Sequence, residues 1–506
     1  MDRFLRPLTG RIPFALTAAL ALPALSSSAP LAAQEAPVMQ PSPRDGVEWD
    51  QARASLVAQA PGQMAQAVQR WELLTSTDKL GFDDYAGFLT RYPGFPQEAK
   101  LRGYAEGALD RETVSPDRLA AYFDKFPPLT NPARARYALA LATLGRSDAG
   151  EAARAAWRGG KMDATQEAYI FGTYGSRFTA ADHDARMEAL LWQGDADGAS
   201  REIIYTSGPK QSLYLARLSL LRGAVPESAG LTVPGNAIHD PGFVWNLVKF
   251  YRKTGQYAQA TQLLATRPDY TSLPFDAEDM VGEMLRTAKG ADARSAARIA
   301  ASVDDLFAPG TDIRGESYRT RDDYTSLMWL GGTKALWDLG DGAAAAPLFY
   351  RYGAAARTPQ TRSKGFYWAG KAARMAGDNA GATRYWQMAA TYPDRFYGML
   401  ALKALGQPMP DLHDQPHTAP TQAERAAFAS DPLVLAVREV ARTAPWRTGI
   451  QFYNTIADRA TSEAEHVLVL ELAQQTGRRD LAVILSSSAE EDGHKGFTVA
   501  GFPTLP

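Results

Sequence analysis

A short turn pattern recurs six times along this chain and constrains its fold more than any other feature of the sequence. Each copy has a Gly followed within a few residues by Ala, with mostly polar residues between them, and the copies begin at Gly145, Gly194, Gly255, Gly340, Gly377 and Gly477. A Gly can take the left-handed conformation that ends one helix, and the polar residue after it can cap the next. Each copy therefore predicts a helical hairpin, two helices joined by a tight turn.

The segments between these turns favour helices from residue 49 to about residue 485. Val and Ile are sparse, and no long run alternates apolar and polar residues as strands do. One hairpin cannot bury its apolar face alone, whereas stacked hairpins can. The turns are irregularly spaced, so the chain shares the hairpin logic of tetratricopeptide repeats without their fixed period. We predict an all-α fold: an α-superhelix, or solenoid, of irregular helical hairpins, ring or U shaped, followed by a small helical linker domain.

Three successive helices in the second half of the chain show the pattern most clearly. Thr358 suits the N-cap and Pro359 the first position of one helix. Apolar and small residues that would admit a close neighbour follow on one face of it: Phe366, Ala369, Gly370 and Ala373. A second helix follows the turn at Gly377 and stops at Tyr392-Pro393. The apolar residues of a third are Phe396, Met399 and Leu400.

The first 33 residues have the features of a secretory signal peptide. Arg3, Arg6 and Arg11 precede an apolar run at 12–25, and small residues end the segment. The alternative is a short N-terminal membrane anchor, because Leu31 is an imperfect residue three positions before the cleavage point. Since the chain has no Cys, a lipoprotein anchor is excluded. Export without cysteine predicts a periplasmic protein with no membrane anchor after signal cleavage.

The composition excludes several classes of function. The formal net charge is only -2, which gives no reason to expect nucleic acid as a partner. Without Cys there is no disulfide framework, thiolate metal site or Cys nucleophile. The six His are scattered, with no pair four residues apart on one helix. We therefore expect no metal and no cofactor.

These observations divide the chain into six parts. The predicted parts are a signal peptide at 1–33, a disordered lead-in at 34–46, the superhelical domain at 47–407, a Pro-rich linker at 408–420, a helical linker domain at 421–497 and a connector at 498–506. Within the fifth part, residues 486–495 are polar and predicted to form a loop.

A group of motifs lies in the three helices described above. They are Tyr367-Trp368, Gly370-Lys371-Ala372, Tyr392-Pro393 and Phe396-Tyr397-Gly398. They resemble the closing hairpin of the superhelix in the soluble lytic murein transglycosylases of Gram-negative bacteria. Further similar motifs are Arg321-Asp322, Trp329-Leu330, Phe82, Tyr85 and Tyr92-Pro93. The resemblance covers roughly residues 49–506 and is weakest at about 205–310.

The resemblance implies a role in peptidoglycan (murein) and cell-wall turnover. Members of that family append a lysozyme-like domain with a Glu-Ser pair and a later Gly-Leu-Met-Gln block. Its Glu protonates the glycosidic oxygen between N-acetylmuramic acid and N-acetylglucosamine and then acts as base while a 1,6-anhydro ring closes. Such a Glu has to be held protonated near neutral pH by an apolar pocket.

That catalytic motif is missing from this sequence. The pairs Glu227-Ser228 and Glu316-Ser317 occur, but no Gly-Leu-Met-Gln block follows either. We therefore name no catalytic residue and expect the chain to be truncated before a catalytic domain and to lack the cleavage step. One hypothesis is a transglycosylase-family protein that binds glycan strands, its catalytic domain lost, split off or absent from this sequence. The other is a free-standing periplasmic α-solenoid that scaffolds envelope proteins.

Aromatic residues of the motif-bearing helices are the candidates for glycan contact. They are Tyr367, Trp368, Tyr385, Trp386 and Tyr397. Aromatic rings can stack on sugars, but at helical spacing they are also common in a hydrophobic core, and that alternative stays open for each of them. The partners expected from the resemblance are peptidoglycan glycan strands, and other cell-wall enzymes are a further expectation.

Overall fold

The computed structural model of the protein describes residues 62–413 and 415–502. Helices joined by short loops make up this part of the chain, and none of its residues lies in a strand. The predicted all-α solenoid of helical hairpins is confirmed. The predictions for the signal peptide and the lead-in fall outside the described residues.

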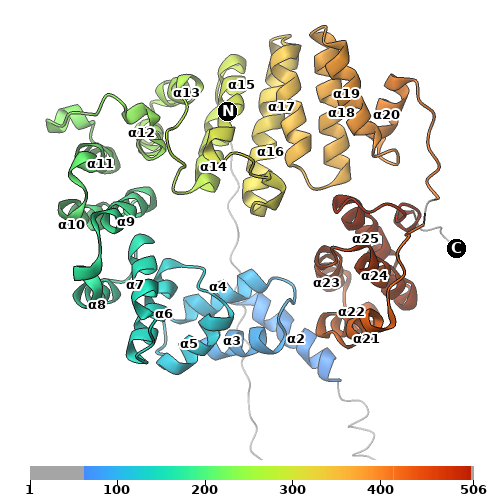
Figure 1. Ribbon diagram of the computed structural model, residues 1–506, viewed down its shortest axis with the longest axis horizontal. Helices are drawn as coiled ribbons and strands as arrows, with labels where there is room; N and C mark the ends of the chain where they lie inside the picture. Colours follow the sequence, from blue (N-terminus) through green and yellow to red (C-terminus); the bar gives the residue numbers. More distant parts are fainter. Residues whose placement is uncertain (1–61, 414, 503–506) are drawn as a thin grey trace, which may run out of the picture. The chain divides into compact units, whose positions relative to one another are not determined.

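Figure 1 follows the helices in chain order. The first half of the array contains α2 (Gln63–Ser76), α3 (Phe82–Arg91), α4 (Glu98–Ala108), α5 (Pro116–Lys125), α6 (Asn131–Thr143), α7 (Ala149–Arg158), α8 (Ala164–Tyr174), α9 (Ala180–Gln193), α10 (Ala196–Glu202), the 3₁₀ turn η2 (Ile203–Tyr205), α11 (Gly208–Leu221), η3 (Pro226–Ala229), α12 (Pro241–Lys253) and α13 (Tyr257–Thr266). The second half contains α14 (Ala277–Lys289), α15 (Ala293–Ala301), η6 (Ile313–Gly315), α16 (Tyr318–Thr333), the π-helical segment η7 (Lys334–Asp338), α17 (Gly342–Ala355), α18 (Pro359–Met375), α19 (Asn379–Ala390), α20 (Phe396–Leu405), α21 (Gln422–Ser430), α22 (Pro432–Thr443), α23 (Trp446–Arg459), α24 (Glu463–Thr476) and α25 (Arg479–Glu491).

The six predicted Gly turns form, and at three of them the residue directly after the Gly caps the next helix with its side chain: Asp195, Asp341 and Asp378. Their Gly residues all have positive φ: Gly145, Gly194, Gly255, Gly340, Gly377 and Gly477. At Gly377, φ is +83°, in the left-handed region that side chains with a Cβ rarely adopt. Asp378 directly after it accepts a hydrogen bond from the Gly381 N–H and caps α19. The Gly therefore ends one helix and its neighbour starts the next.

Small residues bring α17, α18 and α19 close together, and these helices lie side by side (Figure 1). A Cβ added to Gly365 of α18 would lie 2.5 Å from the Cα of Gly353 in α17. On the other face of α18, a Cβ on Gly370 would overlap the indole of Trp386 in α19. The predicted close approach of a second helix is confirmed, and backbones this near leave no room for any other residue.

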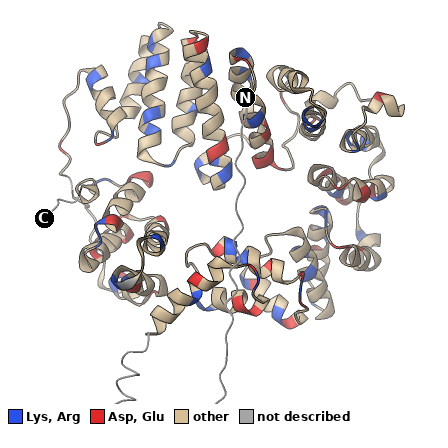
Figure 2. Cartoon of the chain, turned by 180° about the vertical axis from the view of Figure 1, so that it is seen from behind, with Lys and Arg blue, Asp and Glu red and all other residues tan. Residues whose placement is uncertain are grey.

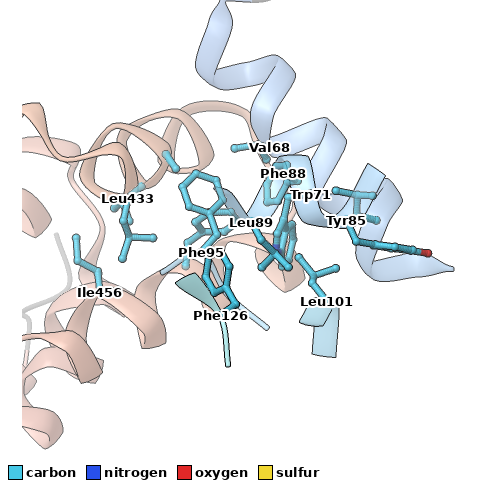
Figure 3. Close-up of a cluster of buried hydrophobic side chains, with 14 of the residues drawn as sticks. Val68, Trp71, Tyr85, Phe88, Leu89, Phe95, Leu101, Phe126, Leu433 and Ile456 are labelled. Atoms are coloured by element: carbon cyan, nitrogen blue, oxygen red, sulfur yellow. The ribbon is translucent and has the colours of Figure 1, made fainter. Parts of the chain in front are cut away.

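The core is a series of hydrophobic clusters, each shared by neighbouring helices. One cluster differs, because it combines residues from the beginning and the end of the described chain. It joins Val68, Trp71 and Phe95 to Leu433 and Ile456 (Figure 3). Helices α2 and α22 pack directly on each other there. The last helices therefore complete the core of the first ones.

Polar contacts accompany this junction. Thr448 Oγ1 donates to Glu72 Oε1 at 2.6 Å, which ties α23 to α2. A second tie joins the N-terminal end of α20 to α25, where Arg395 Nη2 lies 2.6 Å from Glu490 Oε2. The domain boundaries proposed from the sequence remain predictions.

The loop predicted at residues 486–495 is wrong over its first part, because α25 continues to Glu491. Leu481, Leu485 and Ala489 are buried at intervals of four residues and hold this helix on its neighbours. Ser488 is buried too and donates its hydroxyl to the Ala457 carbonyl at 2.9 Å. A helix rich in Ser is therefore stabilised here by packing and not by intrinsic propensity.

No helix in the described part of the chain is long and apolar enough to cross a membrane. Lys and Arg as well as Asp and Glu are spread over the helices of the array (Figure 2). This distribution agrees with the small net charge of -2. The surface gives a ligand no broad field of a single sign.

Candidate functional site

Three of the five aromatic candidates lie together. The ring of Tyr367 on α18 is 6.0 Å from that of its neighbour Trp368 and 5.6 Å from that of Tyr397 on α20, measured between centroids. All three side chains are half-buried. Partly exposed rings on adjacent helices have free surface to offer a ligand.

The series of rings continues across three further elements. Trp368 meets Trp337 of η7 edge to face at 5.2 Å, Trp337 lies 6.3 Å from Trp329 of α16, and Trp329 lies 5.0 Å from Tyr352 of α17. The aromatic face, as we call it, consists of Tyr397, Tyr367, Trp368, Trp337, Trp329 and Tyr352. The six rings form a connected series, and three of them, Trp329, Trp337 and Trp368, also contact the buried ring of Phe349.

Trp337 is the most accessible member of the row, with 55% of its surface exposed. Phe396 extends the row at its other end, since it lies 5.2 Å from Tyr397 and is 57% exposed. Large apolar side chains exposed to this degree beside other aromatic rings mark an interaction surface more often than isolated exposed ones. The predicted third helix forms as α20, with Phe396 and Met399 on its exposed side and Gly398, Ala401 and Leu402 buried.

A π-helical turn explains how two Trp residues eight positions apart become neighbours. In an α-helix, two side chains that are eight positions apart in the sequence point about 80° apart around the helix axis. Two side chains that are seven positions apart point in nearly the same direction. Segment η7 (Lys334–Asp338) has the wider π turn, which accommodates one extra residue. Trp329 and Trp337 therefore come to the same side.

A single amino group sits among the rings. Lys364 Nζ lies 3.5 Å from the centroid of Trp329 and 5.4 Å from that of Tyr352. No carboxylate of the described residues is within ion-pair distance of it, and burial lowers the pKa of Lys364. The cation–π contacts hold this ammonium group where it can donate hydrogen bonds to a ligand on the aromatic face.

The other two candidates lie elsewhere. Trp386 is buried beneath Gly370, and its indole N–H donates to the Tyr367 carbonyl at 3.3 Å. Tyr385 contacts Tyr350 at 5.6 Å, outside the row of rings. For Trp386 the core interpretation applies. The sequence missed Trp337, Tyr352 and Lys364, because helical periodicity does not reveal neighbours created by a π turn or by contact between helices.

The two Glu-Ser pairs do not belong to the aromatic face. Ser317 caps α16 and its hydroxyl hydrogen-bonds the Glu278 carboxylate, so this serine serves the local structure. Glu316 precedes the helix, thirteen residues before Trp329, a separation of about 20 Å along a helix axis. Glu227 is exposed in η3.

A buried ionic network lies in the first half of the array. His183 of α9 does not pair with its acidic sequence neighbours, because its Nδ1 lies 2.6 Å from Glu202 Oε1 on α10. Its neighbours have other partners, since Asp182 pairs with Arg158 and Asp184 accepts from Ser207. Within the described residues no group of His, Asp and Glu is arranged to hold a metal ion.

No protein-family profile and no curated protein matches the chain. Solved structures are similar to it, and we describe three of them. They are a complex of the 70-kDa soluble lytic transglycosylase with bulgecin A (15% identity, 90% of this chain and 71% of that one, TM-score 0.44), the 70-kDa soluble lytic transglycosylase of Escherichia coli (16%, 90% and 71%, 0.41) and an inactive mutant of the lytic transglycosylase Slt of Pseudomonas aeruginosa (16%, 90% and 70%, 0.44).

Proposed function

We propose that this protein binds the glycan strands of peptidoglycan in the periplasm, and that the aromatic face is its contact surface. The observation that carries the proposal is the row of six touching rings, with the Lys364 ammonium group among them. A glycan strand is a linear series of pyranose rings with apolar faces and polar edges. A row of aromatic rings with a hydrogen-bond donor beside it matches both features of such a ligand.

The motifs that resemble the soluble lytic murein transglycosylases support the same substrate. Tyr367-Trp368 and Phe396-Tyr397-Gly398 are among those motifs, and they supply half of the row. The predicted signal peptide at 1–33 supports export to the compartment that contains peptidoglycan.

We further propose that residues 34–506 bind glycan without cleaving it. Cleavage by that family needs a carboxylic acid beside the bound glycosidic oxygen. The charged side chain among the rings of the aromatic face is the amine of Lys364, and a carboxylic acid held in an apolar pocket, which the reaction needs, is not part of that face.

The test is co-sedimentation of residues 34–506 with purified sacculi. We expect the wild-type chain to pellet and the Trp337→Ala variant to bind at least about fivefold more weakly, since one stacked ring contributes about 1 kcal/mol. Trp446→Ala is the matched control, because Trp446 is a similarly exposed tryptophan on α23, outside the face. It should bind like the wild type.

Failure of the wild type to pellet, or equal binding by Trp337→Ala, would refute the contact surface. The same incubations are analysed for 1,6-anhydro-muropeptides, and we expect none above the buffer level. Their release would refute the proposal that these residues lack the cleavage step.

A further inference from the structure

A groove in the first half of the array is separate from the aromatic face. It lies between α8 on one side and α10 and η2 on the other, and has a volume of about 600 Å³. That size falls within the range of small-ligand sites, about 300–1,000 Å³. Its lining includes three aromatic side chains, one from each of three elements, and three charged ones.

The aromatic residues are Trp157 of α7, Phe171 of α8 and Tyr205 of η2. Phe171 stacks on Trp157 with 5.2 Å between centroids, and Tyr205 lies 5.3 Å from Phe171. Trp157 is buried, Phe171 half-buried and Tyr205 43% exposed. The rings therefore lead from the interior of the array to its surface.

The charged groups of the groove neutralise one another. Arg186, whose side chain is almost completely buried behind the groove, contacts Glu202 at 3.1 Å and Glu167 at 3.0 Å. Arg201 contacts Glu167 at 3.2 Å from the open side. Burial raises the pKa of Glu202. Two arginines and two glutamates thus leave no unpaired charge to attract an ionised ligand.

One donor in the lining lacks a partner. The indole N–H of Trp157 is buried and has no hydrogen-bond acceptor among the described residues. Buried donors without an acceptor are rare and costly, so a bound water or ligand oxygen is the expected acceptor here. A groove with stacked rings and no unpaired charge suits a neutral ligand with an apolar face.

We propose that this groove is a second carbohydrate subsite, which takes an N-acetylated pyranose of the glycan strand. The inference rests on the proposed function, because the strand supplies the sugar. The pyranose face packs on the more exposed rings, Tyr205 and Phe171, next to the buried indole of Trp157. A stem peptide fits less well, because its ionised termini would compete with four charges that already pair with one another.

The experiment uses residues 34–506 labelled with ¹⁵N, in which each of the ten tryptophans gives one indole signal. A Trp157→Phe variant identifies the Trp157 signal by its disappearance. Chitotetraose, a neutral soluble N-acetylglucosamine oligomer, is then titrated in, and we expect the Trp157 signal to shift to saturation. The titration is repeated in Trp337→Ala, where the shift should persist because the aromatic face does not contribute to it.

Tyr205→Ala should weaken chitotetraose binding at least about fivefold, as expected for one lost stacking ring. Tyr169→Ala is the matched control, because Tyr169 is a 63% exposed tyrosine on α8 that does not line the groove. It should bind like the wild type.

Three results would overturn the subsite. The first is an unmoved Trp157 signal at saturating chitotetraose in a chain that pellets with sacculi, which leaves the proposed function intact. The second is a shift with the free tetrapeptide stem of peptidoglycan but not with chitotetraose. The third is equal affinity of Tyr205→Ala and wild type. A chain that neither pellets nor shifts contradicts both proposals.

Discussion

The indole of Trp71 and the ring of Phe452 meet edge to face, with 4.9 Å between their centroids. Trp71 belongs to α2 and Phe452 to α23, so the contact joins the first helix of the described chain to one of the last. Both side chains are buried in the cluster that the two ends share. In most solenoids each unit contacts only its neighbours, and the terminal units need polar outer faces. Here the two terminal regions cover each other.

Replacement of Trp71 by Ala should therefore destabilise both ends of the chain together. We expect the free energy of unfolding to fall by about 3–5 kcal/mol, the usual cost of removing a buried tryptophan. Hydrogen exchange should then accelerate in α2 and in α22–α25, as well as around the substitution. Trp446→Ala on α23 is the control, and we expect it to stay within about 0.5 kcal/mol of the wild type because Trp446 is largely exposed. Faster exchange in α2 alone would contradict the shared core.

Two glycines in helix interiors should respond to Ala in opposite directions. Gly365→Ala would place a methyl group against the backbone of Gly353, and we expect a loss of about 1–3 kcal/mol or more as α17 and α18 separate. Gly103 of α4 has open space where a Cβ would be, so Gly103→Ala should stabilise the protein by about 0.5–1 kcal/mol. Thermal unfolding measures both. Equal effects would mean that the packing of α17 on α18 does not depend on this close approach.

The sequence was sufficient for the fold because its strongest signals are local. A Gly with positive φ and a polar capping residue act within one turn of the chain, and the predicted turn forms at Gly377, with Asp378 as the cap of α19. Predictions failed where contacts between segments distant in the sequence determine the local secondary structure. Residues 486–491 are helical because Leu485 and Ala489 pack against other helices. The Ser-rich sequence of this segment does not itself predict a helix.

The candidate site was predicted in part for the same reason. Tyr367 and Trp368 were found because they belong to one recognisable motif. Trp337 was missed because a π turn, which has no sequence signature here, brings it to the same side as Trp329. The groove at Trp157 was missed as well, since its rings come from helices whose pairing cannot be deduced from periodicity.

Arg186 should be essential for stability although it is not a catalytic residue. Its loss in Arg186→Met leaves the buried Glu202 carboxylate with His183 as a neighbour but without its arginine, and we expect a cost of about 3–5 kcal/mol in chemical denaturation. The double variant Arg186→Met/Glu202→Gln removes the uncompensated charge and should recover part of this loss. Arg201→Ala, at the exposed side of the same network, should cost less than about 1 kcal/mol. If the losses in unfolding free energy from the two single substitutions simply added up in the double variant, Arg186 and Glu202 would not be coupled.

Glu491 should make the protein less stable as the pH rises towards neutrality. This carboxyl lines a cavity with Asp458, Asp492 and Arg357, and burial, followed by the charge of Asp458, raises its pKa to about 7. Arg357 and Arg321 act in the opposite direction without cancelling the effect. Since the folded protein holds this proton more tightly than the unfolded chain, the stabilisation is complete below the ordinary pKa of Glu. It is lost as the pH rises to about 7.

Glu491→Gln keeps the neutral form at every pH and should remove this dependence. We expect the variant to match the wild type at pH 4 and to exceed it at pH 8 by about 1–3 kcal/mol, the upper value corresponding to the full pKa shift. Denaturant unfolding at intervals between these pH values measures the difference. Asp458, whose pKa burial also raises, remains in both proteins, so a common residual slope is expected. A variant less stable than the wild type at pH 8 would show that the ionised Glu491 gains more from Arg357 and Arg321 than it loses by burial, and the sign of the prediction would be wrong.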